Sequence, residues 1–321
     1  MTMQKRLLTK CDIDGMTSGI LLKELGLIDT VLFCNPQDIE KGHVQITDND
    51  ITAGLPCREH AYLAFDHYQL PDIAQGNHPT IIVDKSMRST SRVICNYFGR
   101  QQFSSIPDEL LHVVDKVISA DVTLDDILYP AGWMLLSYLI DQRTGLDRYA
   151  HFSNSNAELI EMLMDLCRKQ TIWEVLNHAP VEERSTCYFA QVDACKSQIM
   201  RCTTMYNNLL VVDMRNEEIV YPGNRFMLYA LFSECNVSLQ VMRHYSGKKT
   251  TFIVGKSFLD RSLSTDIGSI MQENGGSGHQ NAGICEVDND QADSVMRNLI
   301  AALQYGTLKN LFMGYFNYYY P

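Results

Sequence analysis

A single stretch, Lys10-Cys11-Asp12-Ile13-Asp14-Gly15-Met16-Thr17-Ser18, decides how the N-terminal half of this sequence folds. The apolar run at residues 7–9 predicts a buried strand before it, and apolar residues at helical spacing predict a helix over 15–26 after it. Asp12 and Asp14 are two residues apart, so an extended chain places both carboxylates on one face. Because such close carboxylates repel each other unless a cation separates them, this strand end predicts a divalent-metal site; a solvated Asp-Gly turn is the alternative.

Composition places the chain among ordinary globular proteins and suggests a cytoplasmic location. The 321 residues are enough for two domains, with 45% hydrophobic and 20% charged residues. We find no apolar run of membrane-spanning length and no apolar signal core at the N-terminus, and the ten cysteines stand singly, as expected for reduced thiols. With 27 basic against 38 acidic residues, the net charge of -11 argues against long duplex nucleic acid as a partner but allows a short phosphorylated ligand.

Strand-like and helix-like segments alternate over residues 5–130, which predicts an α/β fold with a doubly wound, mainly parallel sheet. Further strands are expected at 30–35, 61–65 and 80–83, and a helix at 89–98 with Ser89 as its N-cap and Gly99 just past its end. Helices dominate from 107 to 202.

A second, smaller α/β domain is expected after a helical linker, giving domains at 1–180 and 207–321 with the linker at 181–206. Its expected elements are a strand at 209–213, a helix at 224–232, a hairpin of 237–243 with 250–254, a Gly-rich loop at 275–283 and a helix at 291–303.

Acids and a histidine recur at other predicted strand ends and near a helix. Asp50 lies in Asp48-Asn49-Asp50-Ile51, and the strand at 61–65 leads into Asp66-His67-Tyr68. Asp115 and Asp121 lie in a helical region. Carboxylates with one imidazole suit Mn²⁺ or Mg²⁺, and two such ions would clamp both oxygens of a phosphoryl displacement. For Asp66-His67, a strand-end capping hydrogen bond is the alternative.

The Gly-rich stretch Gly275-Gly276-Ser277-Gly278-His279-Gln280-Asn281-Ala282-Gly283 predicts an anion site, because small residues let backbone N–H groups approach a phosphate. His279 can donate to the same anion, and Arg261 can bind it bidentately. A flexible surface turn is the alternative. Arg143 and Arg148 are further candidates to face phosphate, with a surface ion pair as the alternative.

Three motifs in this order resemble the DHH phosphoesterase family: Asp12-Ile13-Asp14-Gly15-Met16-Thr17-Ser18, Asp66-His67-Tyr68 and Gly276-Ser277-Gly278-His279-Gln280-Asn281-Ala282-Gly283. Residues 33–38, 49–51, 89–99 and 141–148 resemble its exopolyphosphatase-like or nanoRNase-like branch. The resemblance implies a DHH-type catalytic domain followed by a DHH-associated substrate-binding domain, with a Mn²⁺-dependent site (Mg²⁺ being possible) in the interdomain cleft.

By matching position, the resemblance implies site residues in both domains. The metal ligands would be Asp12, Asp14, Asp50 and His67, with Asp50 bridging two ions and a metal-activated water attacking phosphorus. A terminal phosphate would be held by Arg261, Gly275, Gly276, Ser277, Gly278 and His279. Family members are commonly homodimers, so a homodimer is expected.

The sequence departs from the family pattern at four positions. Lys10 stands where the family usually has a His or Asp ligand, and Tyr68 replaces the second His, which faces the substrate phosphate. Ile118 takes the place of the late acidic ligand, with Asp115 and Asp121 close by, and Ser277 replaces a glycine. An ammonium at Lys10 can supply the charge of one cation, leaving one metal or none. The candidate catalytic residues are therefore Lys10, His67 and Tyr68.

Three functions remain open on these observations. The first is a metal-dependent phosphohydrolase acting on a small nucleotide or short oligonucleotide. The second is a family member that binds a phosphorylated ligand without turnover, which the departures favour. The third is an exopolyphosphatase, which the net charge of -11 disfavours.

Overall fold

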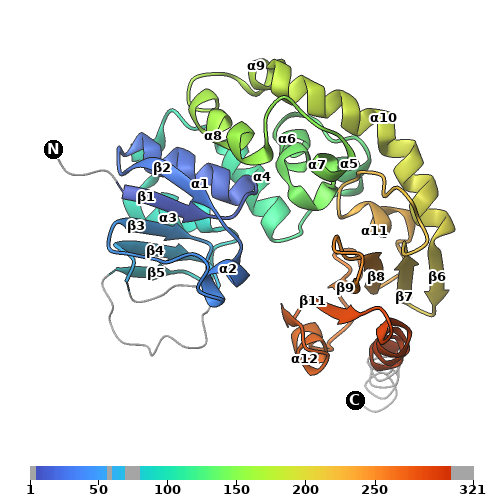
Figure 1. Ribbon diagram of the computed structural model, residues 1–321. Coiled ribbons are helices and arrows are strands. Elements are labelled where there is room, and N and C mark those ends of the chain that lie inside the picture. The colour runs from blue at the N-terminus through green and yellow to red at the C-terminus, as the bar shows by residue number, and fades with distance from the viewer. Residues whose placement is uncertain (1–4, 56–59, 69–79, 305–321) are drawn as a thin grey trace, which may run out of the picture. The chain divides into compact units, whose positions relative to one another are not determined.

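The computed structural model describes residues 5–55, 60–68 and 80–304 (Figure 1). The chain divides into two compact units, Met1–Ala190 and Gln191–Pro321, and the division falls within helix α10 (Ala179–Arg201). Across the described ranges, every helix is too short or too polar to cross a membrane.

The first unit contains a five-stranded parallel sheet in the order β2-β1-β3-β4-β5, which confirms the doubly wound α/β prediction (Figure 1). Its strands are β1 (Lys5–Thr9), β2 (Ile28–Phe33), β3 (Asp50–Ala53), β4 (Leu63–Asp66) and β5 (Ile81–Val83). From β1 the chain moves first to one side, to β2, and then to the other, to β3. The strand order therefore reverses between β1 and β3, and ligands of open parallel sheets bind at the carboxyl ends of the strands at such a reversal.

Alternating residues of β1 face two different layers. Leu7 lies beneath α1 (Ile13–Glu24), whereas Leu8 packs on the other face with Cys34, Ile39 and Leu55, around α2 (Pro36–Glu40). Helix α1 in turn packs against α3 (Thr90–Phe98), α4 (Asp108–Ile118) and α8 (Asn156–Leu166). Both faces of the sheet are thus covered, as its apolar strands require.

The remaining helices of this unit follow the sheet in sequence. They are η1 (Arg100–Phe103), α5 (Leu124–Leu128), α6 (Gly132–Ile140), η2 (Gln142–Thr144), α7 (Leu146–Tyr149) and α9 (Ile172–Leu176). Helix α6 is almost wholly apolar and buried, so it serves as a core helix.

The second unit contains a six-stranded mixed sheet in the order β10-β11-β9-β8-β7-β6. Its elements are β6 (Thr203–Tyr206), β7 (Leu209–Asp213), α11 (Met227–Leu231), β8 (Val237–Arg243), β9 (Lys249–Lys256), α12 (Ile267–Glu273), β10 (Ser277–His279), β11 (Ala282–Asp288) and a helix over 292–304. Strands β7 and β8 are parallel and the other pairs antiparallel. The second, smaller α/β domain is therefore confirmed.

Two elements differ from the sequence prediction. Residues 50–53 form strand β3, so Asp50 begins a strand where an acid at a strand end was expected. Residues 277–288 form the hairpin of β10 with β11, where a Gly-rich loop was expected. Both strands are hard to recognise in sequence, because β3 is four residues long with two polar side chains and glycine weakens strand propensity in β10.

Candidate functional site

The carboxyl ends of β1, β3 and β4 bring the first group of candidate residues together in the first unit. Lys10 follows the last residue of β1, Gly54 the last residue of β3, and His67 the last residue of β4. Because β1 and β3 flank the reversal of strand order, these residues stand where the topology places a ligand.

The two acids of the first motif have different tasks. Asp12 is the N-cap of α1, and one of its oxygens accepts a hydrogen bond from the Gly15 N–H at 3.0 Å. Asp14 is buried, and its two oxygens accept the N–H groups of Thr90 at 3.0 Å and Ser91 at 2.8 Å. Asp14 therefore accepts two N–H groups from the first turn of α3 and joins that helix to the first turn of α1.

His67 is buried next to the hydrogen bonds between Asp14 and the start of α3. Its Nδ1 lies 2.9 Å from Thr90 Oγ1, while its buried Nε2 has no hydrogen-bond partner. Burial lowers the pKa of His67 below its ordinary value, although the carboxylates of Asp14 and Asp66 act to raise it. When Nδ1–H donates to Thr90, the neutral ring leaves the Nε2 lone pair available to a ligand.

Asp66 is occupied by the backbone that follows it. Its Oδ1 accepts the N–H groups of His67 at 2.7 Å and Tyr68 at 3.1 Å, which is the strand-end capping arrangement considered above. Burial raises the pKa of Asp66, against the opposing effects of these N–H donors and of Lys10. Asp66 therefore shapes the turn that presents His67.

Lys10 extends over Gly54. A Cβ atom added at Gly54 would lie 3.4 Å from Lys10 Cε, 3.7 Å from Lys10 Nζ and 3.0 Å from Thr90 Oγ1. Gly54 also has a φ of +64°, a conformation that favours glycine. Throughout the described part of the chain, Lys10 Nζ finds no hydrogen-bond or ion-pair partner.

Arg143 and Tyr68 complete this cluster. The Arg143 guanidinium forms an ion pair with Asp141 at 2.7 Å, yet 48% of its side chain is exposed. Burial acts to lower the pKa of Arg143, but Asp141 outweighs it and raises the pKa, with smaller contributions from Asp12 and Tyr68. The Tyr68 ring is half-exposed and its centroid lies 4.1 Å from that of His67.

Asp50 is not part of this cluster, which corrects its expected role as a bridging ligand. Asp50 begins β3 and pairs in register with Arg6 of β1, at the amino ends of these two strands and away from the cluster at their carboxyl ends. The Arg6 guanidinium donates to both of its oxygens, at 2.7 and 3.1 Å, and the Thr47 N–H donates at 2.7 Å. Asp50 is therefore a buried structural anion.

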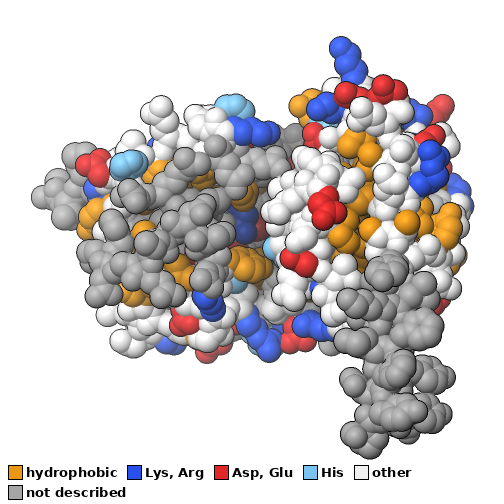
Figure 2. Space-filling model, turned by 90° about the horizontal axis from the view of Figure 1, so that it is seen from below, with side chains coloured by type: hydrophobic (Ala, Val, Ile, Leu, Met, Phe, Trp, Pro, Cys, Tyr) orange, Lys and Arg blue, Asp and Glu red, His pale blue; other side chains and the backbone are white. Residues whose placement is uncertain are grey.

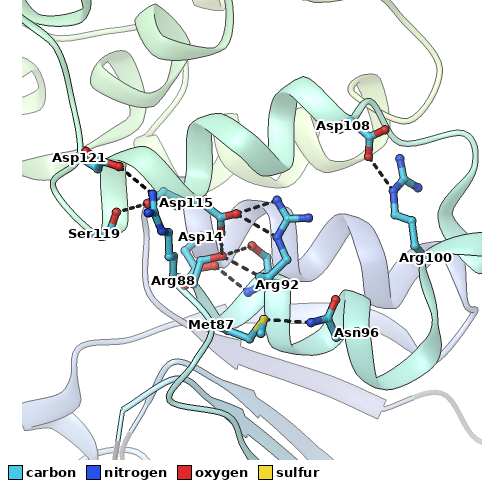
Figure 3. Close-up of polar contacts among 12 residues, drawn as sticks. Asp14, Met87, Arg88, Arg92, Asn96, Arg100, Asp108, Asp115, Ser119 and Asp121 are labelled. Atoms are coloured by element: carbon cyan, nitrogen blue, oxygen red, sulfur yellow. Dashed lines mark hydrogen bonds and ion pairs between the residues drawn. The ribbon is translucent and has the colours of Figure 1, made fainter.

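Asp115 and Asp121 are likewise held by arginines (Figure 3). Asp115 accepts from Arg92 at 2.6 Å and from Ser89 Oγ at 2.6 Å, and Asp121 forms an ion pair with Arg88 at 2.7 Å. The Asp115 contacts fasten the start of α3 to α4, and neither carboxylate is left for a late metal position.

The donor set does not fit a two-ion centre. Within residues 5–55, 60–68 and 80–304, no three His, Cys, Asp or Glu side chains are grouped so that they could hold a metal ion. Both Asp14 oxygens serve α3, and Asp50, Asp115 and Asp121 are paired with arginines. Among the described residues, one oxygen of Asp12, Oδ2 of Asp66 and Nε2 of His67 make no hydrogen bond, but these side chains are not grouped as a three-ligand metal site, so the arrangement favours at most one ion that also binds substrate oxygens.

The second group of candidates lies in the second unit, where glycine serves packing. A Cβ atom on Gly276 would lie 2.1 Å from the Ile284 carbonyl oxygen, and one on Gly278 would lie 2.6 Å from that of Ala282. The N–H groups of Gly275 and Gly276 donate to the end of α12, at 3.0 and 2.8 Å. These two N–H groups are therefore already used within the protein.

Several candidate residues of this region are exposed. Ser277, Gly278 and His279 form the outer strand β10 and are exposed. Arg261 is exposed, and its Nε donates to the Phe258 carbonyl at 3.3 Å. A phosphate would meet side chains here more readily than a backbone cradle.

Sequence reasoning missed Thr90, Gly54 and Asp141. Thr90 orients His67, Gly54 lies directly against the end of the Lys10 side chain, and Asp141 positions Arg143. An accurate boundary for β3 would have placed Gly54 at its carboxyl end.

Comparison with solved structures finds chains that match over most of this one. A structure described as the pGpG-specific phosphodiesterase PggH from Vibrio cholerae is 37% identical, covers 94% of this chain and 100% of its own, and superposes with a TM-score of 0.79. RecJ from Thermus thermophilus, solved with Mn²⁺, is 13% identical, with a TM-score of 0.50 over 94% of this chain and 52% of its own; it supports the fold. No protein-family model and no curated protein sequence matches the chain.

Proposed function

Because the chain belongs to the DHH phosphoesterase family, we propose that it is a phosphodiesterase that hydrolyses a dinucleotide or short oligonucleotide. One observation carries the proposal: 37% identity, over 94% of this chain, to a structure described as a pGpG-specific phosphodiesterase. The cluster at the carboxyl ends of β1, β3 and β4 supports it, since cations, an imidazole and a carboxylate meet there.

Each residue of the cluster has a separate role in phosphodiester hydrolysis. Water adds to phosphorus, a phosphorus–oxygen bond breaks, and the leaving oxygen takes a proton. Lys10 and Arg143 attract the phosphate, and Arg143 is kept in place by Asp141. Tyr68 presents its phenol beside them, in the role expected for the residue that faces the phosphate. Asp14 and Thr90 fix the position of His67 through α3.

Asp12 and His67 Nε2 would hold a single divalent ion, which polarises a phosphoryl oxygen when it is bound. A nitrogen donor favours Mn²⁺ over Mg²⁺, whose ligands are almost entirely oxygens. In the second unit, Arg261 and His279 would bind a terminal phosphate. The homodimer remains a prediction, which light scattering of the purified protein would test.

The direct test is hydrolysis of pGpG by the full-length protein, followed by chromatography of the products. We expect turnover that a chelator abolishes and Mn²⁺ restores. His67→Gln should lower kcat/KM by about 100-fold or more, because it removes the unpartnered ring nitrogen. His43→Gln is the matched control, since His43 is an exposed residue of the same unit.

The contrary outcome supports a second function. If the wild-type protein binds pGpG but never cleaves it, with or without Mn²⁺, the chain is a ligand-binding member of the family. The shortage of metal donors among the described residues is the observation that favours this alternative. Equal turnover by the wild type and His67→Gln would instead remove His67 from the site.

A further inference from the structure

We propose that the Lys10 ammonium is a built-in cation above the end of β3 that binds a non-bridging oxygen of the scissile phosphate and supplies positive charge that a second metal ion would supply in a two-ion centre. This inference rests on the proposed function for its substrate class. It concerns how the phosphate is held, and it is tested by binding as well as by turnover.

The first support is the position of Lys10. It stands between the carboxyl ends of β1 and β3, at the reversal of strand order, and its ammonium lies over a strand end that has no side chain. A Cβ atom at position 54 would be in ordinary contact with Nζ, at 3.7 Å, so the ammonium lies directly against this strand end. The φ of +64° and the 3.0 Å to Thr90 Oγ1 favour glycine at position 54, which leaves the strand end beneath the ammonium without a side chain.

The second support is that Lys10 is a partly buried residue whose ammonium is unpaired among the described residues. An ammonium is costly to remove from water unless a counter-charge meets it. The nearby carboxylates do not provide one at contact distance: Asp14 is bound to α3, and Asp66 to the N–H groups of His67 and Tyr68. Over the described residues, Lys10 Nζ makes no hydrogen bond or ion pair. A phosphate oxygen would supply the missing partner.

The third support is the charge balance of the cluster. Two divalent ions would bring four positive charges to a site where, as far as the structure describes it, no three acidic, histidine or cysteine side chains are grouped to ligate even one of them. One ion with the fixed charges of Lys10 and Arg143 would offer a phosphodiester comparable attraction while needing fewer ligands.

The test is a binding cycle with two pGpG analogues, one with a charged phosphorothioate linkage that is hydrolysed slowly and one with a neutral methylphosphonate linkage. Calorimetry with the full-length protein measures both affinities. We expect the wild type to prefer the charged linkage by about 10-fold or more, as a hydrogen bond to a charged group predicts. Lys10→Gln should show a preference of less than about 3-fold, because the partner of that charge is gone.

Two further variants keep this result interpretable. Lys169→Gln removes an equal charge from an exposed position of the same unit and should keep the wild-type preference. Lys10→Met supplies a second neutral side chain of similar length if Lys10→Gln folds poorly.

The proposal is overturned if Lys10→Gln keeps the full preference, or if it weakens binding of both analogues equally, as a purely structural lysine would. Titration with Mn²⁺ alone gives an independent readout. One bound ion per wild-type chain or none is expected, and two tightly bound ions would also overturn it. Failure of pGpG turnover with an intact binding cycle would refute hydrolysis but not the role of Lys10.

Discussion

Asp50 illustrates, at the scale of a single residue, how neighbours determine what a carboxylate can do. Burial would raise its pKa, but hydrogen bonds from Arg6 and Thr47 outweigh burial and hold the pKa below its ordinary value. A carboxylate that stays ionised through such bonds stabilises the fold above the ordinary carboxyl pKa of about 3.9, and loses that contribution as the pH falls through its lowered value.

We therefore expect Asp50→Asn to lower the free energy of unfolding by about 1.5–3 kcal/mol near pH 7, the usual worth of hydrogen bonds to a charged group. The difference from the wild type should stay constant down to about pH 5 and shrink below about pH 4. Urea unfolding at several pH values measures it, with the exposed neighbour changed in Asp48→Asn as the control. Mn²⁺ affinity should be unaffected. A large loss of Mn²⁺ binding in Asp50→Asn would restore its role as a ligand.

The sequence placed the first motif correctly at the end of a strand but misplaced Asp50, for a physical reason. Asp12, Asp14 and His67 follow or adjoin apolar strands, whose ends are marked by the change from apolar to polar residues. Asp50 lies between a polar loop and a strand of four residues, and nothing in that pattern says on which side of the acid the strand lies. The sequence prediction misplaced the boundary of β3. This error moves the Asp50 side chain from the carboxyl ends of the strands to their amino ends.

At the scale of an element, the hairpin of β10 and β11 shows the same limit for glycine. A run of glycines is compatible with an anion cradle or with a closely packed hairpin, because both exploit the missing Cβ atom. Here Gly278 pairs directly with Gly283 across the hairpin, and Gly276 lies against the Ile284 carbonyl. Packing alone explains these glycines.

Gly276→Ala should accordingly destabilise the second unit by about 1–3 kcal/mol, as overpacking commonly does, because its Cβ atom would overlap the β11 backbone. Gly247→Asn is the matched control. Gly247 has a φ of +70° with no atom within 4 Å of a Cβ position, and Asn tolerates that backbone conformation. Thermal unfolding of both variants makes the comparison. If Gly276→Ala unfolds like the wild type yet loses affinity for pGpG, the cradle would be the better explanation.

At the scale of the whole molecule, charge limits the length of the ligand. On the face drawn in Figure 2, Lys and Arg side chains lie among Asp and Glu side chains rather than apart from them. With a net charge of -11, the chain repels a long polyanion outside the site, whereas a dinucleotide contacts little beyond it.

Long-chain polyphosphate should therefore compete with pGpG at least about 10-fold more weakly, per molecule, than unlabelled pGpG does, because long-range repulsion opposes it. Fluorescence competition at two salt concentrations measures this. Added salt should improve polyphosphate binding relative to pGpG, since it screens the repulsion. Strong competition by polyphosphate, accompanied by release of phosphate, would favour the hypothesis that the protein is an exopolyphosphatase.

The contact between Lys10 and Gly54 has a consequence for how this protein can change. A side chain at position 54 would touch Lys10, with its Cβ atom 3.4 Å from Cε and 3.7 Å from Nζ, so a substitution there changes the surroundings of the ammonium. An aspartate at 54 beside the unchanged lysine would neutralise the ammonium. A histidine at 10 beside the unchanged glycine would lose the fixed charge without gaining a ligand from β3. The effect of a substitution at either position therefore depends on the residue at the other, and the two positions form one functional unit.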